Sequence, residues 1–318
     1  MAHLTYRHPT EDDLPLMAMV SDRSCADLPF YRPVTLQELR VETFGSEDFD
    51  PKGAKIVFDG DRPVAVGEAI VEKARVEHGL NEGWMRLFVV PEARGAGIEE
   101  NLMSFMEEYL RGRGVERAVA RYYTSDPWFK EVTERMRMSP VRLFSHLEFK
   151  RGQVVPEVPL PHDVTIERYD FKTATRQQLQ AFIDIDNETF AEHWGHAPMP
   201  VEKALEWQRA TEVVHCLNMA RSGERSVGAT FLEDSVLYNK EHGTKDGWVN
   251  VLGVVKDRRH QGLGRALLVD GMHWLLGRGL DTIFIGVDTE NERALNLYTG
   301  VGFSLKYQVV VVNKKLRG

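Results

Sequence analysis

One stretch of this sequence decides the fold: Val254-Val255-Lys256-Asp257-Arg258-Arg259-His260-Gln261-Gly262-Leu263-Gly264-Arg265-Ala266-Leu267-Leu268. The residues before it, from Trp248 to Val255, have the apolar and β-branched composition of a buried strand. After it, Leu263, Leu267 and Trp274 recur at the spacing of one helical face. The sequence therefore predicts a strand, a glycine-rich turn and a helix, in that order.

The turn itself has the composition of an anion-binding site. The unpaired N–H groups at a helix N-terminus carry partial positive charge. Gly262 and Gly264 lack side chains, so an anion can approach the backbone closely, and Arg258, Arg259 and Arg265 add cationic donors. We predict a phosphate or pyrophosphate site here. The alternative is an ordinary strand-to-helix turn with a solvated basic face.

A second motif follows the buried strand predicted over Ile283–Asp288. It has the form N-x-x-A-x-x-L-Y-x-x-x-G-F, made by Asn291, Ala294, Leu297, Tyr298, Gly302 and Phe303. With R-x-x-G-x-G in the turn, it resembles the GNAT superfamily, the coenzyme A-dependent N-acyltransferases. The turn matches neither the P-loop nor the dinucleotide-binding pattern. For Tyr298 the alternative is a core aromatic with a satisfied hydroxyl.

Length, composition and charge narrow the class of protein. A chain of 318 residues is long enough for two domains. The net charge of −8 argues against a general nucleic-acid binder, and no apolar run is long enough to span a bilayer. Cys25 and Cys216 are the only cysteines, which fits a reducing cytoplasm, and no zinc spacing occurs. We expect a cytoplasmic monomer or homodimer that binds no nucleic acid, membrane or metal.

The chain repeats itself. An offset of 165 residues places Arg94 on Arg259 and Gly97 on Gly262. The segment 151–162 contains three prolines and no helical period, so we expect two domains, 1–152 and 163–318. The two-copy organisation resembles that of mycothiol synthases within the superfamily. The resemblance implies an α+β fold, two tandem GNAT folds, each with a mixed, mostly antiparallel twisted sheet flanked by helices.

Local patterns predict the elements of both copies. Helices are expected over 12–20, 36–43, 99–111, 175–190 and 200–211, and strands over 4–7, 55–58, 64–71, 84–90, 117–123, 165–169, 215–220 and 226–232.

The two copies differ where chemistry is expected. At the offset of 165, Gly264 of the second copy corresponds to Glu99 of the first, and Tyr298 corresponds to Thr133. A carboxylate beside a pyrophosphate would repel it. We therefore expect the first copy to be a non-catalytic packing partner and the second copy to be active.

The resemblance also implies roles in the second copy, with acetyl-CoA as the acyl donor. Backbone amides of Leu252, Gly253 and Val254 would bind the pantetheine arm and the thioester oxygen. Asn291 would contact the cofactor, and Tyr298 would protonate the departing sulfur. The residues that would surround the pyrophosphate are Arg259, His260, Gln261, Gly262, Leu263, Gly264 and Arg265.

The general base is less defined. Many relatives carry glutamate at the position of Trp248. Asp246 and Asn250 share its strand parity, so Asp246 is a candidate base, directly or through water, and Asn250 a candidate for orienting a water. Glu233 and Asp234 at the end of the preceding strand are further candidates. For each acid, a solvated structural role is the alternative.

The acceptor pocket is expected after the helix that precedes Glu192, His193 and Trp194, where relatives build it. The alternative is a helix end capped by Gly195. We expect an N-acetyltransferase acting on a primary amine of a small molecule or peptide by direct attack. A non-catalytic acyl-CoA-binding or assembly module is the second hypothesis. A nucleotide-binding oxidoreductase is third, because no acidic residue follows the turn at ribose-binding spacing.

Overall fold

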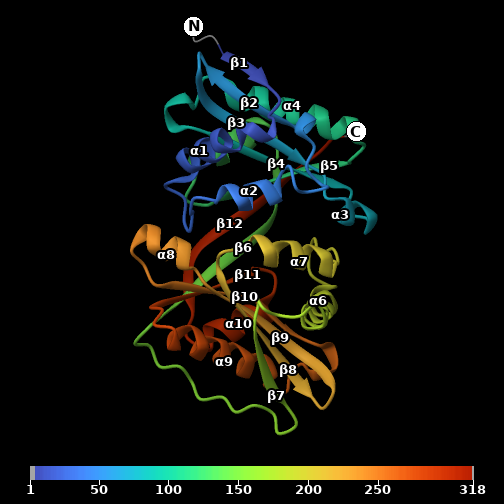
Figure 1. The fold of residues 1–318 in the computed structure, drawn as a ribbon, viewed down its shortest axis with the longest axis vertical. Helices are drawn as coiled ribbons and strands as arrows, with labels where there is room; N and C mark the ends of the chain where they lie inside the picture. The colour runs from blue at the N-terminus through green and yellow to red at the C-terminus, as the bar shows by residue number, and fades with distance from the viewer. Residues whose placement is uncertain (1–3, 317–318) are drawn as a thin grey trace. The chain divides into compact units, whose positions relative to one another are not determined.

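The structure is a computed structural model and describes residues 4–316. It contains two compact units (Figure 1). The first unit takes the chain up to Leu143 together with the residues from Gln308 onward, and the second unit is Phe144–Tyr307. The unit boundaries therefore fall inside two long strands, β6 (Ser139–Lys150) and β12 (Ser304–Lys315). The proline-containing segment after β6 belongs wholly to the second unit, and the two sequence domains, 1–152 and 163–318, stay a prediction.

Within residues 4–316, the strands of each unit form a mixed sheet that includes one parallel pair. In the first unit the spatial order is β1 (Leu4–Arg7), β2 (Ala54–Asp59), β3 (Arg62–Ile70), β4 (Glu82–Val89), β5 (Arg117–Tyr123) and β12. In the second it is β6, β11 (Thr282–Asp288), β10 (Asp246–Val254), β9 (Arg225–Asp234), β8 (Val214–Ser222) and β7 (Thr165–Asp170). The parallel pairs are β4 with β5 and β10 with β11.

Helices cover these sheets. The first unit has α1 (Leu14–Cys25), α2 (Leu36–Glu42), α3 (Lys73–Glu77), α4 (Ile98–Gly112) and α5 (Pro127–Arg135). The second has α6 (Arg176–Phe190), α7 (Val201–Ala210), α8 (Val236–His242), α9 (Leu263–Gly277) and α10 (Glu292–Thr299). These mostly antiparallel sheets flanked by helices confirm the predicted α+β fold. No helix within residues 4–316 is long and apolar enough to cross a bilayer.

The central strands show why helices must cover both faces of each sheet. In β3 every residue after the first is buried, and in β9 the run Val227–Leu232 is buried. Successive side chains of a strand point to opposite faces, so continuous burial requires a cover on each face. Both α1 and α4 contact β3 and β4, while α6 and α9 contact β9 and β10. These helices place the strand-to-helix turns at the ends of β4 and β10.

The last strand of each sequence copy completes the sheet of the other unit. Residues 309–315 of β12 pair antiparallel with β5, and residues 144–150 of β6 pair antiparallel with β11. In the second unit Leu147 and Phe149 of β6 are buried in the core formed with α9 and β11. In the first unit Lys314 of β12 forms an ion pair with the buried carboxylate of Glu107, at 2.6 Å between Nζ and Oε1.

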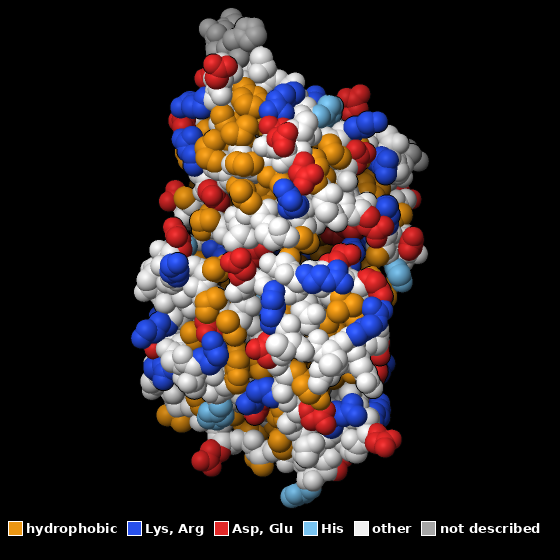
Figure 2. Space-filling view, in the orientation of Figure 1, with side chains coloured by type: hydrophobic (Ala, Val, Ile, Leu, Met, Phe, Trp, Pro, Cys, Tyr) orange, Lys and Arg blue, Asp and Glu red, His pale blue; other side chains and the backbone are white. Residues whose placement is uncertain are grey.

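The surface mixes charges of both signs. Lys and Arg side chains lie among Asp and Glu side chains over the face shown in Figure 2. A surface of this kind differs from the basic stripe that nucleic-acid phosphates select.

The strand from the first copy should decide whether the second unit folds by itself. A fragment of residues 163–307 lacks the β6 segment, so it loses two buried side chains and leaves β11 as an open edge. Removing one large buried side chain typically costs about 2–5 kcal/mol. We expect this fragment to aggregate and the 144–307 fragment to melt cooperatively. Size-exclusion chromatography and thermal unfolding measure this, and equal solubility and melting would contradict it.

Candidate active site

The second unit contains a cavity of about 510 Å³ at the C-terminal ends of β10 and β11. Most of the predicted site residues line it: Asn250, Leu252, Gly253, Val254, Arg259, His260, Gly262, Gly264, Arg265, Asn291, Tyr298, His193 and Trp194. Asp246, Gln261, Leu263 and Glu192 do not belong to the lining. The cavity also has walls that the sequence did not indicate, among them Phe144, His146, Thr189 and Arg293.

The cavity exists because two parallel strands separate. β10 pairs with β11 only over Asp246–Val249, and then the strands diverge. The pairing of β10 with β9 shifts between Val249 and Val251, so Asn250 is the extra residue of a β-bulge. Bulges commonly redirect strands at active sites. Beyond the bulge, β10 still pairs with β9, and its residues Leu252, Gly253 and Val254 line the cavity.

The turn after β10 is a nest of backbone amides. It begins with a short 3₁₀ helix (Lys256–Arg258) and ends where α9 begins at Leu263. His260 has φ 63° and Gly262 has φ 81°, both in the left-handed region. Alternation of this kind points successive N–H groups into one concavity, which binds anions. A left-handed histidine is unusual and marks a position where the backbone geometry itself is needed.

The arginines of the turn also hold the backbone. Arg259 Nε donates to the carbonyl of Val254 at 3.0 Å, and its Nη2 donates to the carbonyl of Thr189 at 3.3 Å. Arg265 Nη2 donates to the carbonyl of Gly300 at 2.9 Å. Arg258 is held by Asp163 through two hydrogen bonds of 2.8 and 2.9 Å. These bonds fix the end of β10 and the ends of the adjoining helices around the nest.

Two of the three residues predicted for the acceptor pocket line the cavity, and the third does not. His193 and Trp194 line the cavity, whereas the exposed Glu192 lies 3.1 Å from Lys256 Nζ and 3.9 Å from Arg259 Nη1. Burial, together with Arg259, lowers the pKa of His193 below its usual value. This histidine is therefore neutral at pH 7, and Glu192 lies beside the cations of the turn.

Two residues of the late motif lie at the cavity wall. Asn291 Oδ1 accepts a hydrogen bond from the Ala294 amide at 3.1 Å, so this side chain caps α10 and keeps its Nδ2 as a donor. Tyr298 is buried, and its hydroxyl makes no hydrogen bond within the described residues. Burial raises the pKa of Tyr298 well above its usual value. Its hydroxyl thus keeps its proton throughout the neutral range, as a proton donor must.

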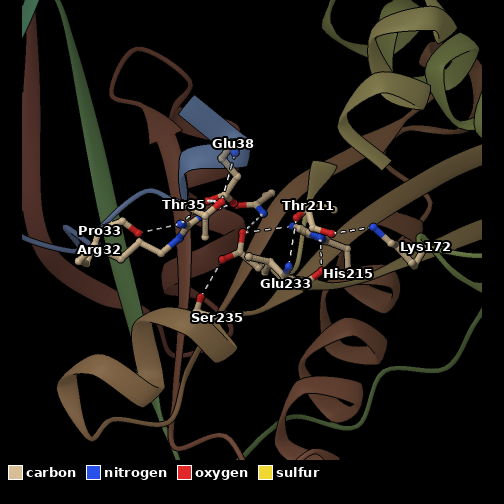
Figure 3. A network of polar contacts seen from close by, with 11 residues as sticks. Arg32, Pro33, Thr35, Glu38, Lys172, Thr211, His215, Glu233 and Ser235 are labelled. Atoms are coloured by element: carbon tan, nitrogen blue, oxygen red, sulfur yellow. Dashed lines mark hydrogen bonds and ion pairs between the residues drawn. The ribbon is translucent and has the colours of Figure 1, made fainter. Parts of the chain in front are cut away.

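A polar cluster in the second unit surrounds Glu233 (Figure 3). Glu233 lies directly opposite Trp248 in the β9–β10 register. Asn250 Nδ2 donates to Glu233 Oε2 at 3.0 Å and Ser235 Oγ donates to Oε1 at 2.8 Å, while His215 Nε2 lies 3.5 Å from Oε2. Burial raises the pKa of Glu233, but His215 and the two hydrogen bonds outweigh it and the net shift is downward.

Asp246 lies at the opposite end of β10 from the turn. It is the first residue of the strand, pairs with Thr282 of β11 and is buried. Burial raises its pKa, and hydrogen bonds from Thr282 and Thr244 oppose that shift. Four residues of strand, about 13 Å, separate it from Asn250. The structure thus brings Glu233, rather than Asp246, to Asn250.

Comparison with known proteins identifies a family domain in the second unit. Residues 179–303 match the acetyltransferase (GNAT) family. The chain therefore carries a GNAT domain, and it is an enzyme of the acyltransferase class, as its two motifs predicted. The mycothiol acetyltransferase of Tsukamurella paurometabola is 26% identical over 245 residues, which cover 71% of this chain and 81% of that protein.

Two solved structures share the whole fold. A tandem GNAT protein from the clavulanic acid biosynthesis pathway superposes with a TM-score of 0.76 at 14% identity and covers 99% of both chains. A GCN5-related N-acetyltransferase from Sphaerobacter thermophilus has a TM-score of 0.68 at 20% identity and covers 99% of this chain and 96% of its own. These likenesses confirm the tandem GNAT fold.

Gly264 gives a direct test of the nest. Its Cβ position is 3.7 Å from the nearest atoms, so alanine fits without strain. We expect Gly264→Glu to weaken coenzyme A binding about ten-fold or more, because it places a carboxylate beside the cofactor's phosphates. Gly264→Ala should bind within a few-fold of the wild type. Titration calorimetry measures both, and wild-type affinity in the glutamate variant would remove the nest from the site.

Proposed function

We propose that this protein transfers the acetyl group of acetyl-CoA to a primary amine of a small molecule or peptide by direct attack. The observation that carries this proposal is the convergence of three groups on one cavity: the free edge of β10, the amide nest and the Tyr298 hydroxyl. These are the groups that an acyl transfer needs for carbonyl polarisation, phosphate binding and leaving-group protonation.

The residues present fit acetyl-CoA. The nest formed around His260 and Gly262 offers backbone donors to a pyrophosphate, and Gly264 leaves the approach open. The edge of β10 at Leu252–Val254 offers amides to the pantetheine arm and the acyl oxygen. Acetyl-CoA would supply the activated acyl group, and Tyr298 would give its phenolic proton to the sulfur that leaves.

The amine side of the reaction is assigned to Asn250 and Glu233. Asn250 lines the cavity and is hydrogen-bonded to Glu233, so the pair connects the carboxylate to the reacting space. The lowered pKa of Glu233 makes it a weak base for an ammonium group. We infer that Glu233 attracts and orients the acceptor amine, and that solvent takes part in its deprotonation.

Because relatives of this chain are named mycothiol acetyltransferase, the amines to be tested include mycothiol-type acceptors. The other amines to be tested are aminoglycosides, polyamines, amino acids and peptide N-termini. Trp248, at the position where many relatives carry glutamate, is a reason to try the wider panel. The alternative function is a non-catalytic acyl-CoA-binding or assembly module. Release of free thiol from acetyl-CoA, dependent on an added amine, separates the two functions.

Tyr298→Phe tests the acid. This substitution removes only the hydroxyl of a buried ring, so packing is kept. General acids typically contribute about 10²–10⁴-fold, and we expect kcat to fall roughly ten-fold or more with little change in cofactor affinity. Steady-state kinetics and calorimetry on the same preparation measure the two effects. An unchanged kcat would reduce Tyr298 to a packing residue.

The pH dependence tests the amine side. The amine must lose its proton before attack, so kcat/KM should rise with pH, and the raised pKa of Tyr298 keeps the acid protonated over that range. Glu233→Gln should lower kcat/KM more than Asp246→Asn, because Glu233 contacts Asn250 and Asp246 lies remote from the cavity. The reverse order would return the base to Asp246, as the strand parity alone had suggested.

A further inference from the structure

The first unit contains its own anion at the turn that follows β4. Glu99, in the first turn of α4, is fully buried. Its Oε1 accepts hydrogen bonds from the Gly95 amide at 2.7 Å and from Trp128 Nε1 at 3.1 Å. A carboxylate of the chain thus lies on the amides that would otherwise face a ligand. The other oxygen, Oε2, is buried with no hydrogen-bond partner among the described residues.

The two turns have the same geometry, so this carboxylate marks a position in the second unit. Gly97 and Gly262 have φ 80° and 81° and begin the two helices. The arginines that precede them make the same bond, since Arg94 Nε donates to the Val89 carbonyl at 3.2 Å and Arg259 Nε to the Val254 carbonyl at 3.0 Å.

The late helices correspond as well. Asp126 Oδ1 accepts from the Phe129 amide at 3.1 Å, and Asn291 Oδ1 accepts from the Ala294 amide at 3.1 Å. Both caps are related by the offset of 165 found in the sequence. The same offset takes Trp128, a donor to the Glu99 carboxylate, to Arg293.

Arg293 is placed to serve an anion that is not part of the chain. It lines the cavity, and no residue in the described part of the chain forms an ion pair or hydrogen bond with its guanidinium. Arg259 and Asp288 line the same cavity, and the charges of all three residues act on the pKa of His193, the two arginines lowering it and Asp288 raising it. In the first unit, the guanidinium of Arg94 instead lies over the Trp128 ring, 4.0 Å from its centroid.

We propose that Arg293 binds the pyrophosphate of coenzyme A, at the position that the Glu99 carboxylate occupies in the first unit, and that Glu99 closes the first unit to the same group. The inference rests on the proposed function, since it takes coenzyme A as the ligand of the cavity. It adds a pyrophosphate-binding residue that lies outside the turn motif. It also means that a carboxylate of the chain itself occupies the turn of the first unit.

Direct binding to cofactor fragments tests the role of Arg293. Titration calorimetry compares coenzyme A, dephospho-coenzyme A and pantetheine, with the wild-type chain and Arg293→Gln. We expect about a five- to ten-fold loss of affinity for both pyrophosphate-containing ligands, smaller at high salt because Arg293 is exposed. Pantetheine, which has no phosphate, should bind both proteins equally. Arg209→Gln, which removes a cation of α7 outside the cavity lining, is the matched control.

The outcomes separate this inference from the proposed function. A loss limited to coenzyme A would assign Arg293 to the 3′-phosphate and overturn the pyrophosphate position. An equal loss for pantetheine, or no loss at all, would overturn the role of Arg293 while the acetyltransferase proposal stands. If the wild type binds none of the three ligands, the proposed function falls and this inference with it.

The first turn is tested with inorganic pyrophosphate in chains whose second turn is blocked by Gly264→Glu. This single variant should show no binding, whereas adding Glu99→Gly and Trp128→Arg should create one site, because the carboxylate is gone and a cation replaces the indole. Pyrophosphate binding by the single variant would show that the first turn is open. No binding by a triple variant that melts at the temperature of the single variant would overturn the equivalence of the two turns.

Discussion

The separation of two parallel strands is the constraint on which this site depends. β10 and β11 pair over four residues and then diverge, and the edge of β10 past the bulge faces a cavity instead of a strand. A buried backbone group without a partner costs about 1–3 kcal/mol. The fold tolerates this cost because a ligand amide or carbonyl, or water, can take the place of the missing strand. We infer that a ligand binds along that edge and that the turn at its end holds the charged part of the ligand.

The first unit shows the same separation of parallel strands. β4 pairs with β5 over only three residues, Glu82–Trp84, so its parallel strands also diverge. Its pairing with β3 runs without a bulge, however, and the nest at its end holds Glu99. In the first unit a carboxylate of the chain accepts a hydrogen bond from the turn amide of Gly95, whereas in the second unit the corresponding turn faces the cavity. We infer that the same backbone gives a closed turn in the first unit and a ligand site in the second.

The sequence predicted the features that depend on local pattern. The strand–turn–helix around Gly262, the repeat at 165 residues and most of the elements could be found because glycine positions and apolar periodicity are local properties. The pairing of β6 with β11, and of β12 with β5, could not be predicted from the sequence. The apolar pattern of β6 is the same whether its partner is β5 or β11. The position of Glu233 also depended on register, because a shift of one residue would have turned it to the other face of the sheet.

Arg293 shows a different limit. The offset of 165 aligns Arg293 with Trp128, but the two residue types differ, so the alignment alone suggests no shared role. The shared role is suggested only by the Glu99 carboxylate, which accepts hydrogen bonds from Gly95 and Trp128. Trp128 donates a hydrogen bond to an anion of the chain, whereas Arg293 lines the cavity in which the proposed ligand would bind. Arg259 lies 3.9 Å from Glu192, but Arg293 forms no ion pair among the described residues, so the second unit would gain stability when an anionic ligand binds. A ligand that binds only the folded state adds that stability, by about 2.7 kcal/mol at one hundred times its Kd. In the first unit the Glu99 carboxylate already lies at the turn, so we infer that this unit needs no anionic ligand there, whereas the second unit leaves Arg293 for a cofactor.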